Sequence, residues 1–119
     1  NVNIFAQKVG SLILNEKKFL DKSIKHNDKW KKTLPKIINS LGLESYKTFA
    51  NFILVKVDKK KYSKKGILSY LRKKKIIVRN LDNYGLNEFF RVSIGSSDNL
   101  EKFLEELKKS LNHKQCLKK

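Results

Sequence analysis

The sequence predicts an α+β domain in which a long N-terminal helical region precedes further elements in the order β-α-β-β-α. Apolar residues recur at helical spacing over residues 1–42, and a near-continuous apolar run rich in β-branched residues covers 50–57. Two more strand-like stretches then lie between two amphipathic helical stretches. The three predicted strands should form one sheet packed against helices on one face.

Residues 1–42 are predicted to form one long, bent helical region. Their apolar side chains follow a period of about 3.6 residues, with Lys and Asp on the opposite side. Gly42 is a natural C-terminal cap. Pro35 falls inside this pattern and has no N–H to donate to the Lys31 carbonyl, so we expect a kink or a broken turn there.

The three strands are predicted at 50–57, 76–81 and 89–94. The first is apolar at almost every position, which is typical of a strand buried on both faces. Residues 82–86 between the other two have the composition of a turn. Alternation along the third strand divides its side chains between two faces, one with Phe90, Val92 and Ile94 and the other with Phe89, Arg91 and Ser93.

Two shorter helices complete the predicted domain. Ser63 can cap a helix whose last turn is the basic run 72–75, and cations there suit the helix dipole. Asp98 and Glu101 have the spacing of a capping box at the start of a last helix that runs to Leu111. We therefore expect a single domain over 1–112, with 113–119 as a basic, frayed tail.

Length and composition limit the class of protein. The 119 residues suffice for one domain with its own core. No apolar stretch reaches the roughly 18 residues of a membrane span, so no membrane partner is expected. The single cysteine, Cys116, suits a reducing compartment, and we expect a cytoplasmic protein. The sequence contains no Met, from which we expect a piece of a longer or processed chain.

The net charge of +17 raises the possibility of nucleic-acid binding. Lysines are spread over all the polar segments, however, and only three of the 28 basic residues are Arg. No zinc-finger spacing or aromatic RNA-recognition pattern is present. We expect no specific nucleic-acid partner, although a stand-alone basic RNA-binding α+β module stays as an alternative.

The candidate site residues are arginines. Arg91 and Arg79 lie in predicted strands, where an unpaired charge is costly. An Arg fork can bind a carboxylate through two parallel hydrogen bonds, which Lys cannot do. The alternative for Arg91 is a structural ion pair with a nearby Asp or Glu, and for Arg79 a paired or snorkelling side chain. His26 and His113 have no partner at metal-ligand spacing, and we expect both to be solvated.

Several short segments in order resemble a known family. They are residues 1–3 with Ala6 and Gln7, then 50–55, 76–81, 84–86 and 90–96. Together they resemble the C-terminal small domain of fold-type-I aminotransferases that depend on pyridoxal phosphate, and they are most similar to histidinol-phosphate aminotransferase. The likeness covers residues 1 to about 111, with 1–42 as the helical region between the two domains.

The resemblance implies roles for particular residues. Arg91 matches the arginine that binds the α-carboxylate of an amino- or oxo-acid, or the anionic end of the substrate and the co-substrate glutamate in the histidinol-phosphate branch. Arg79 matches a second arginine near the substrate, and Tyr84 and Gly85 would lie near the mouth of the active site. The catalytic and cofactor-binding residues, including the Schiff-base lysine, would belong to a large domain upstream, with none of them and no metal ligand in this chain.

The resemblance therefore implies a chain that is inactive alone and active within a full-length enzyme. That enzyme would bind pyridoxal phosphate in its large domain, act on a small amino, oxo or phosphorylated amino substrate, and form a homodimer. Two alternatives remain besides RNA binding: a pyridoxal-phosphate-dependent decarboxylase acting on a phosphorylated amino acid, and a truncated gene product without function.

Overall fold

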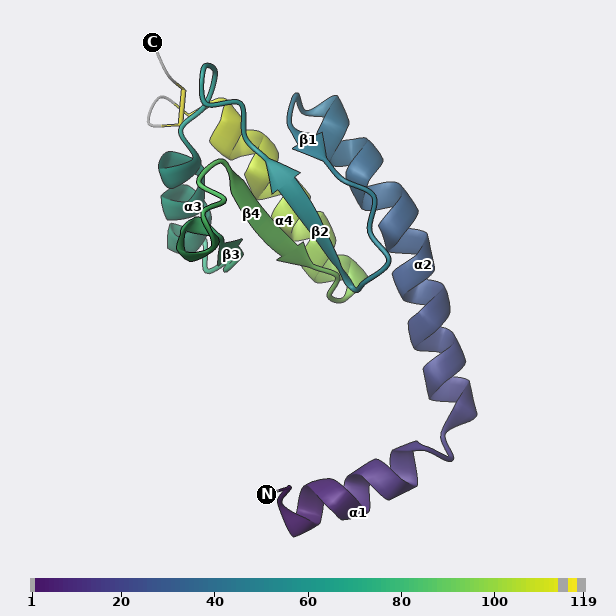
Figure 1. Cartoon of the computed structure of the whole chain (residues 1–119). Coiled ribbons are helices and arrows are strands. Elements are labelled where there is room, and N and C mark those ends of the chain that lie inside the picture. The colour runs from purple at the N-terminus through teal and green to yellow at the C-terminus, as the bar shows by residue number, and fades with distance from the viewer. Residues whose placement is uncertain (1, 114–115, 118–119) are drawn as a thin grey trace.

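The structure is a computed structural model that describes residues 2–113, 116 and 117. It contains the helices α1 (Ile4–Ile13), α2 (Lys17–Ser40), α3 (Lys64–Lys73) and α4 (Ser97–Leu111). Its strands are β1 (Glu44–Ser45), β2 (Phe52–Lys56), β3 (Arg79–Asn80) and β4 (Phe89–Ser93), with a 3-10 turn, η1, at Asp82–Tyr84. The α+β class and the order of the predicted elements are confirmed (Figure 1).

The sheet is four-stranded and antiparallel, in the order β1-β2-β4-β3. The prediction of three strands missed β1, in which Glu44 pairs with Lys56 and Ser45 with Val55. A two-residue polar strand has no apolar alternation to reveal it, since its identity rests on its pairing with β2.

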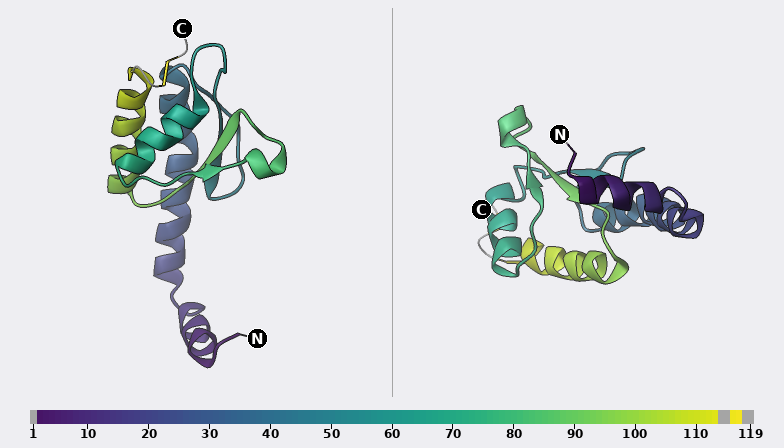
Figure 2. Two further views of the ribbon diagram at one scale, coloured as in Figure 1. Left: turned by 90° about the vertical axis from the view of Figure 1, so that its left-hand side faces the viewer. Right: turned by 90° about the horizontal axis from the view of Figure 1, so that it is seen from below.

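The core lies between one face of the sheet and helices α2, α3 and α4 (Figure 2). The sheet contributes Ile53, Val55, Phe90 and Val92, all of them buried. Phe90 and Val92 share this face of β4, as the alternation predicted. The helices contribute apolar side chains at helical spacing, namely Trp30, Leu34, Ile38, Ile67, Leu71, Leu100, Phe103, Leu107 and Leu111.

The opposite face of the sheet carries no helix of the described residues (Figure 1). On that face of β2 and β4, Ser93 is exposed, and the half-buried side chains include Phe52, Leu54, Phe89 and Arg91. The prediction that 50–57 is covered on both faces is therefore wrong for this chain, in which β2 is buried on alternate residues.

The N-terminal helical region is broken at 14–16 and not at Pro35. Asn3 Oδ1 accepts from the Phe5 N–H at 2.8 Å and caps α1, and a turn at Asn15 separates α1 from α2. Helix α2 continues through Pro35 because Leu34 and Ile38 on either side of it are fully buried in the core. Gly42 ends the helix with a φ of +83°, as predicted.

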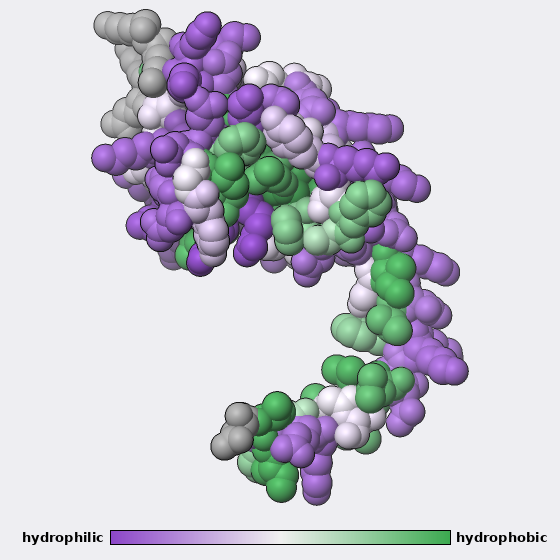
Figure 3. Space-filling view, in the orientation of Figure 1, coloured by the Kyte–Doolittle hydropathy of each residue, from purple (hydrophilic) through white to green (hydrophobic). Residues whose placement is uncertain are grey.

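Helix α1 and the first half of α2 project from the body of the molecule (Figure 2). Helix α1 has no buried residue, although it is strongly apolar. Apolar side chains cover much of α1 and one side of the adjoining turns of α2 (Figure 3). We call this the N-terminal apolar face; it comprises the exposed residues Val2, Ile4, Phe5, Val9, Leu12, Ile13, Leu14, Phe19, Leu20 and Ile24.

The second strand was predicted at 76–81 but is only β3, Arg79–Asn80, because residue 76 is still hydrogen-bonded to the end of α3. The Ile76 N–H donates to the Leu71 carbonyl at 2.9 Å, and Lys75 has a φ of +60°. Ile77 then points to solvent, 84% exposed. The backbone therefore reaches the sheet only at Arg79.

The helix caps are partly as predicted. Ser63 Oγ accepts from the Gly66 N–H at 3.2 Å and caps α3. Helix α4 is capped instead by Ser96, whose Oγ accepts from the Asn99 N–H at 3.4 Å. The Asp98 and Glu101 capping box is wrong, because Asp98 already lies inside the first turn, where its charge suits the helix dipole.

The C-terminal segment is not frayed where the structure describes it. The Cys116 side chain is fully buried, and burial raises the pKa of its thiol. The Ser63 N–H donates to the Cys116 carbonyl at 2.8 Å, and Leu117 forms a β-bridge with Tyr62. Residues 114–115 and 118–119 of the predicted tail lie outside the described residues.

Glu106 on α4 links α4 to α3 through polar contacts. Lys109 Nζ lies 2.8 Å from one Glu106 carboxylate oxygen, and the Tyr70 hydroxyl donates to the other at 3.3 Å. The hydrogen bond and charge of Lys109 lower the pKa of Glu106 below its usual 4.5. Because folding lowers this pKa, the stability that Glu106 contributes is present above pH 4.5 and is lost as the pH falls through the folded-state value.

We expect Glu106→Gln to lower the urea midpoint of the chain at pH 7 and to have progressively less effect toward pH 3. Other carboxylates with lowered pKa values, such as Asp82 and Glu88, titrate with the same sign, so the difference between the variant and the parent isolates Glu106. Glu105→Gln is the control, because Glu105 contacts the same lysine but its side chain is 65% exposed. A difference between Glu106→Gln and the parent that stays constant with pH would contradict this assignment.

Candidate functional site

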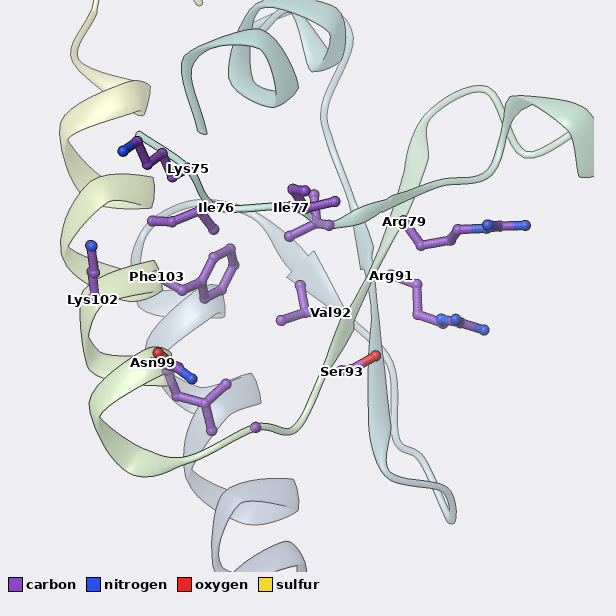
Figure 4. Close-up of a pocket in the computed structure, with 13 residues that line it drawn as sticks. Lys75, Ile76, Ile77, Arg79, Arg91, Val92, Ser93, Asn99, Lys102 and Phe103 are labelled. Atoms are coloured by element: carbon purple, nitrogen blue, oxygen red, sulfur yellow. The ribbon is translucent and has the colours of Figure 1, made fainter. Parts of the chain in front are cut away.

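Arg79 and Arg91 are direct neighbours across the pairing of β3 with β4. Their side chains project from the sheet in the same direction, away from α4 (Figure 4). Directly opposed residues have Cβ atoms about 5 Å apart, and like charges at that distance destabilise a sheet. The two arginines predicted from the sequence are therefore brought together in an arrangement that an anion would stabilise.

Arg91 is half-buried, and its charge is not neutralised by a carboxylate of the described residues. Within residues 2–113, 116 and 117, the ion pairs all use lysines: Lys31, Lys56, Lys59, Lys64 and Lys109. Arg91 Nε is buried and has no hydrogen-bond partner among these residues. The structural ion pair considered as an alternative for Arg91 is thus not formed within the described part of the chain.

The surroundings of Arg91 are mainly apolar and aromatic. Its guanidinium carbon lies 4.9 Å from the centroid of the Phe52 ring, and its cross-strand partner on β2 is Leu54. Further along the same face, the ring of Phe89 packs against Tyr46 with centroids 6.0 Å apart. The apolar side chains of Phe52 and Leu54 next to Arg91 strengthen a hydrogen bond between this arginine and an anion, because water competes less for it.

A cavity of about 340 Å³ lies beside the sheet edge, and both arginines contribute to its lining. Its other walls include Ile76, Val92 and Phe103, with Lys75 and Lys102 at the side of α4. The guanidinium groups point away from Phe103 and from these lysines (Figure 4). The cationic groups therefore do not converge inside the cavity, and the candidate site is the open face of the sheet at Arg79 and Arg91.

The structure also shows where the other residues noted from the sequence lie, namely Tyr84, Gly85, His26 and His113. Tyr84 is 65% exposed on η1, and Gly85 closes that turn with a φ of +73°. His26 is not solvated as predicted: its Nε2 lies 2.8 Å from the Gly95 carbonyl oxygen, a contact across 69 residues of sequence. His113 is exposed, as predicted, and its ring also packs against that of Tyr70, with centroids 5.3 Å apart. Such distant partners leave no periodic signal in the sequence.

Pyridoxal phosphate would need a lysine that is free to form a Schiff base. None of the described lysines is buried, and the three that are half-buried are each paired with a carboxylate, in the pairs Lys31–Asp28, Lys56–Glu44 and Lys64–Asp82. The described lysines therefore include none that is both buried and unpaired. The described residues also contain no cluster of three His, Cys, Asp or Glu side chains that could hold a metal ion.

No helix among the described residues has both the length and the apolar character needed to cross a membrane. No family model matches the chain. Several curated relatives do match the chain. It is 38% identical over 98 residues to the histidinol-phosphate aminotransferase of Campylobacter hominis. That alignment covers 82% of this chain and 26% of the relative. The chain is also 32% identical over 113 residues to the histidinol-phosphate aminotransferase of Pelagibacter ubique. That alignment covers 94% of this chain and 31% of the relative.

A solved structure has the same fold. It is that of a candidate aminotransferase from Burkholderia pseudomallei, which superposes with a TM-score of 0.74 at 22% identity, over 82% of this chain and 29% of the other. The fold and the relatives define the chain as part of an aminotransferase. The chain is most similar to part of the histidinol-phosphate aminotransferases, and it spans less than a third of the length of the curated relatives named above.

Proposed function

We propose that this chain is the C-terminal small domain of a pyridoxal-phosphate-dependent aminotransferase that exchanges an amino group between histidinol phosphate and 2-oxoglutarate. Within it, Arg91 binds the anionic group of the substrate and Arg79 supplies a second cation. The observation that carries this proposal is the pairing of two arginines on an open sheet face, without a carboxylate from the described residues to neutralise Arg91.

The chemistry of the two arginines fits both substrates. The carboxylate of 2-oxoglutarate or glutamate can accept two parallel hydrogen bonds from the Arg91 fork. Histidinol phosphate has a phosphate at its anionic end, which the same fork can bind. Arg79 adds positive charge directly beside Arg91 and balances the higher charge of the phosphate. Pyridoxal phosphate, held by the rest of the protein, would supply the electron-accepting chemistry of transamination.

The N-terminal apolar face supports a larger protein around this domain. Leu14 is 81% exposed and Phe5 is 76% exposed, and contiguous apolar surface of this kind marks an interaction site (Figure 3). We propose that the remaining part of the enzyme, about two thirds of the length of the relatives, covers this face. The homodimeric state and the cytoplasmic location of that enzyme are part of the same proposal.

The test begins with the mass of the native protein, measured by immunoblot with an antibody raised against this chain. We expect a band well above 13.9 kDa. The purified full-length protein, supplied with pyridoxal phosphate, should then form glutamate from histidinol phosphate and 2-oxoglutarate, whereas the 119-residue chain should not. A native band at 13.9 kDa would contradict the proposal, and release of CO₂ from a phosphorylated amino acid without amino transfer would favour the decarboxylase.

A further inference from the structure

We propose that Phe52 is a positioning residue that holds the Arg91 guanidinium in place for bidentate binding of the substrate anion. This inference rests on the proposed role of Arg91 and adds how that side chain is held before a ligand arrives. It is carried by the contact of the Arg91 cation with the Phe52 ring and by the lack of an ion-pair partner for Arg91 among the described residues.

The strand register brings the two side chains together. Phe52 of β2 pairs with Ser93 of β4, and Leu54 pairs with Arg91, so Phe52 is the diagonal neighbour of Arg91 on the same face. The guanidinium carbon lies over the ring, 4.9 Å from its centroid, within the range of a cation–π interaction. Both side chains are half-buried, which strengthens this attraction relative to an exposed pair.

An aromatic partner differs from a carboxylate because it leaves the N–H donors of the arginine free to bind a ligand. A carboxylate would hold Arg91 by accepting hydrogen bonds from its fork, which are the same donors that a substrate anion needs. The Phe52 ring attracts the cation electrostatically and leaves its N–H donors available to hydrogen-bond a substrate anion. The buried Nε of Arg91, which has no partner in the described structure, is consistent with a fork that is held but not saturated.

The second cation–aromatic contact on this face offers a matched control. Lys56 Nζ lies 6.0 Å from the centroid of the Phe89 ring, and the same lysine also pairs with Glu44 at 3.6 Å. Phe89 is half-buried like Phe52 and lies on the same strand as Arg91. A truncation of Phe89 therefore perturbs the same face and the same pair of strands without removing the ring that contacts Arg91.

The experiment measures the dissociation constant of succinate for the full-length protein by calorimetry, together with KM and kcat for 2-oxoglutarate. Succinate carries the two carboxylates but no keto group, so it reports binding alone. Phe52→Leu should raise the dissociation constant and KM about three- to tenfold, because the side chain of Arg91 must then be ordered on binding, with kcat nearly unchanged. Phe52→Tyr should restore both constants, and Phe89→Leu should leave them unchanged.

Pentafluorophenylalanine at position 52 separates the loss of the cation–π interaction from a loss of packing or folding. It keeps the shape of the ring but removes its negative face, so it should also raise the dissociation constant. Unchanged binding in this protein, or an equal loss in Phe89→Leu, would overturn the inference. If Phe52→Leu binds succinate normally while Arg91→Lys does not, the positioning role fails and the role of Arg91 stands. Normal binding by Arg91→Lys would instead contradict the proposed role of Arg91 itself, and with it the positioning role of Phe52.

Discussion

Arg91→Lys in the full-length protein is expected to lower kcat/KM for 2-oxoglutarate by about 10- to 150-fold. A lysine keeps the positive charge but replaces two parallel hydrogen bonds with one mobile point contact. A hydrogen bond to a charged group contributes about 1.5–3 kcal/mol, and the loss of one such bond with its alignment gives a rate effect of this size. Steady-state kinetics with both substrates would measure it.

Two matched substitutions show whether the effect belongs to the site. Arg72→Lys changes an exposed arginine in the last turn of α3 and should leave kcat/KM unchanged. Arg79→Lys should cost less than Arg91→Lys, because Arg79 is exposed and Arg91 is half-buried. The thermal unfolding temperature of all three variants should match that of the parent. Activity of Arg91→Lys within about threefold of the parent would remove Arg91 from the site, since a lost charged hydrogen bond must cost more.

Phe90→Ala is expected to destabilise the chain by about 3–5 kcal/mol, the usual cost of deleting a buried aromatic side chain. The Phe90 side chain is fully buried, and it is among the largest in the core. A domain of this size has a total stability of about 5–15 kcal/mol, so the variant should be unfolded in part at 37 °C. Urea unfolding followed by circular dichroism would give the difference.

Phe89→Ala is the internal control for this prediction. Phe89 is the preceding residue of the same strand, but its side chain lies half-buried on the other face. Its truncation should cost about 1 kcal/mol, the centre of the range for ordinary substitutions. If the two truncations cost the same in the isolated chain, the assignment of the two faces of β4 would be wrong.

Local patterns predicted the parts of the fold that depend on neighbouring residues. The alternation over 89–94 placed Phe90 and Arg91 on opposite faces, and the structure confirms this division, with the Phe90 face in the core. Ser63 and Gly42 were predicted at their helix ends from residue type alone. The scarcity of arginine pointed to Arg91 and Arg79 as site candidates. A chain that has lysine at most basic positions is expected to use its three arginines where the geometry of the guanidinium group matters.

The errors fall where a distant contact decides the local structure. Pro35 favours a kink or a broken turn, but α2 is not broken there, and Leu34 and Ile38 on either side of it are buried. Residues 76–78 have strand composition, yet the hydrogen bond from Ile76 to Leu71 ties them to the end of α3. His26 looked solvated because its acceptor, the Gly95 carbonyl, is 69 residues away.

The sequence by itself thus determined the element types, the faces of β4, the family resemblance and the two candidate arginines. Only the tertiary structure decided that Arg79 and Arg91 stand directly opposite each other and that the Phe52 ring lies against Arg91. The physical reason is that side-chain alternation is a property of one strand, whereas register is a property of two. A slip of one residue between β2 and β4 would leave every local pattern intact and would place a different side chain beside the arginine.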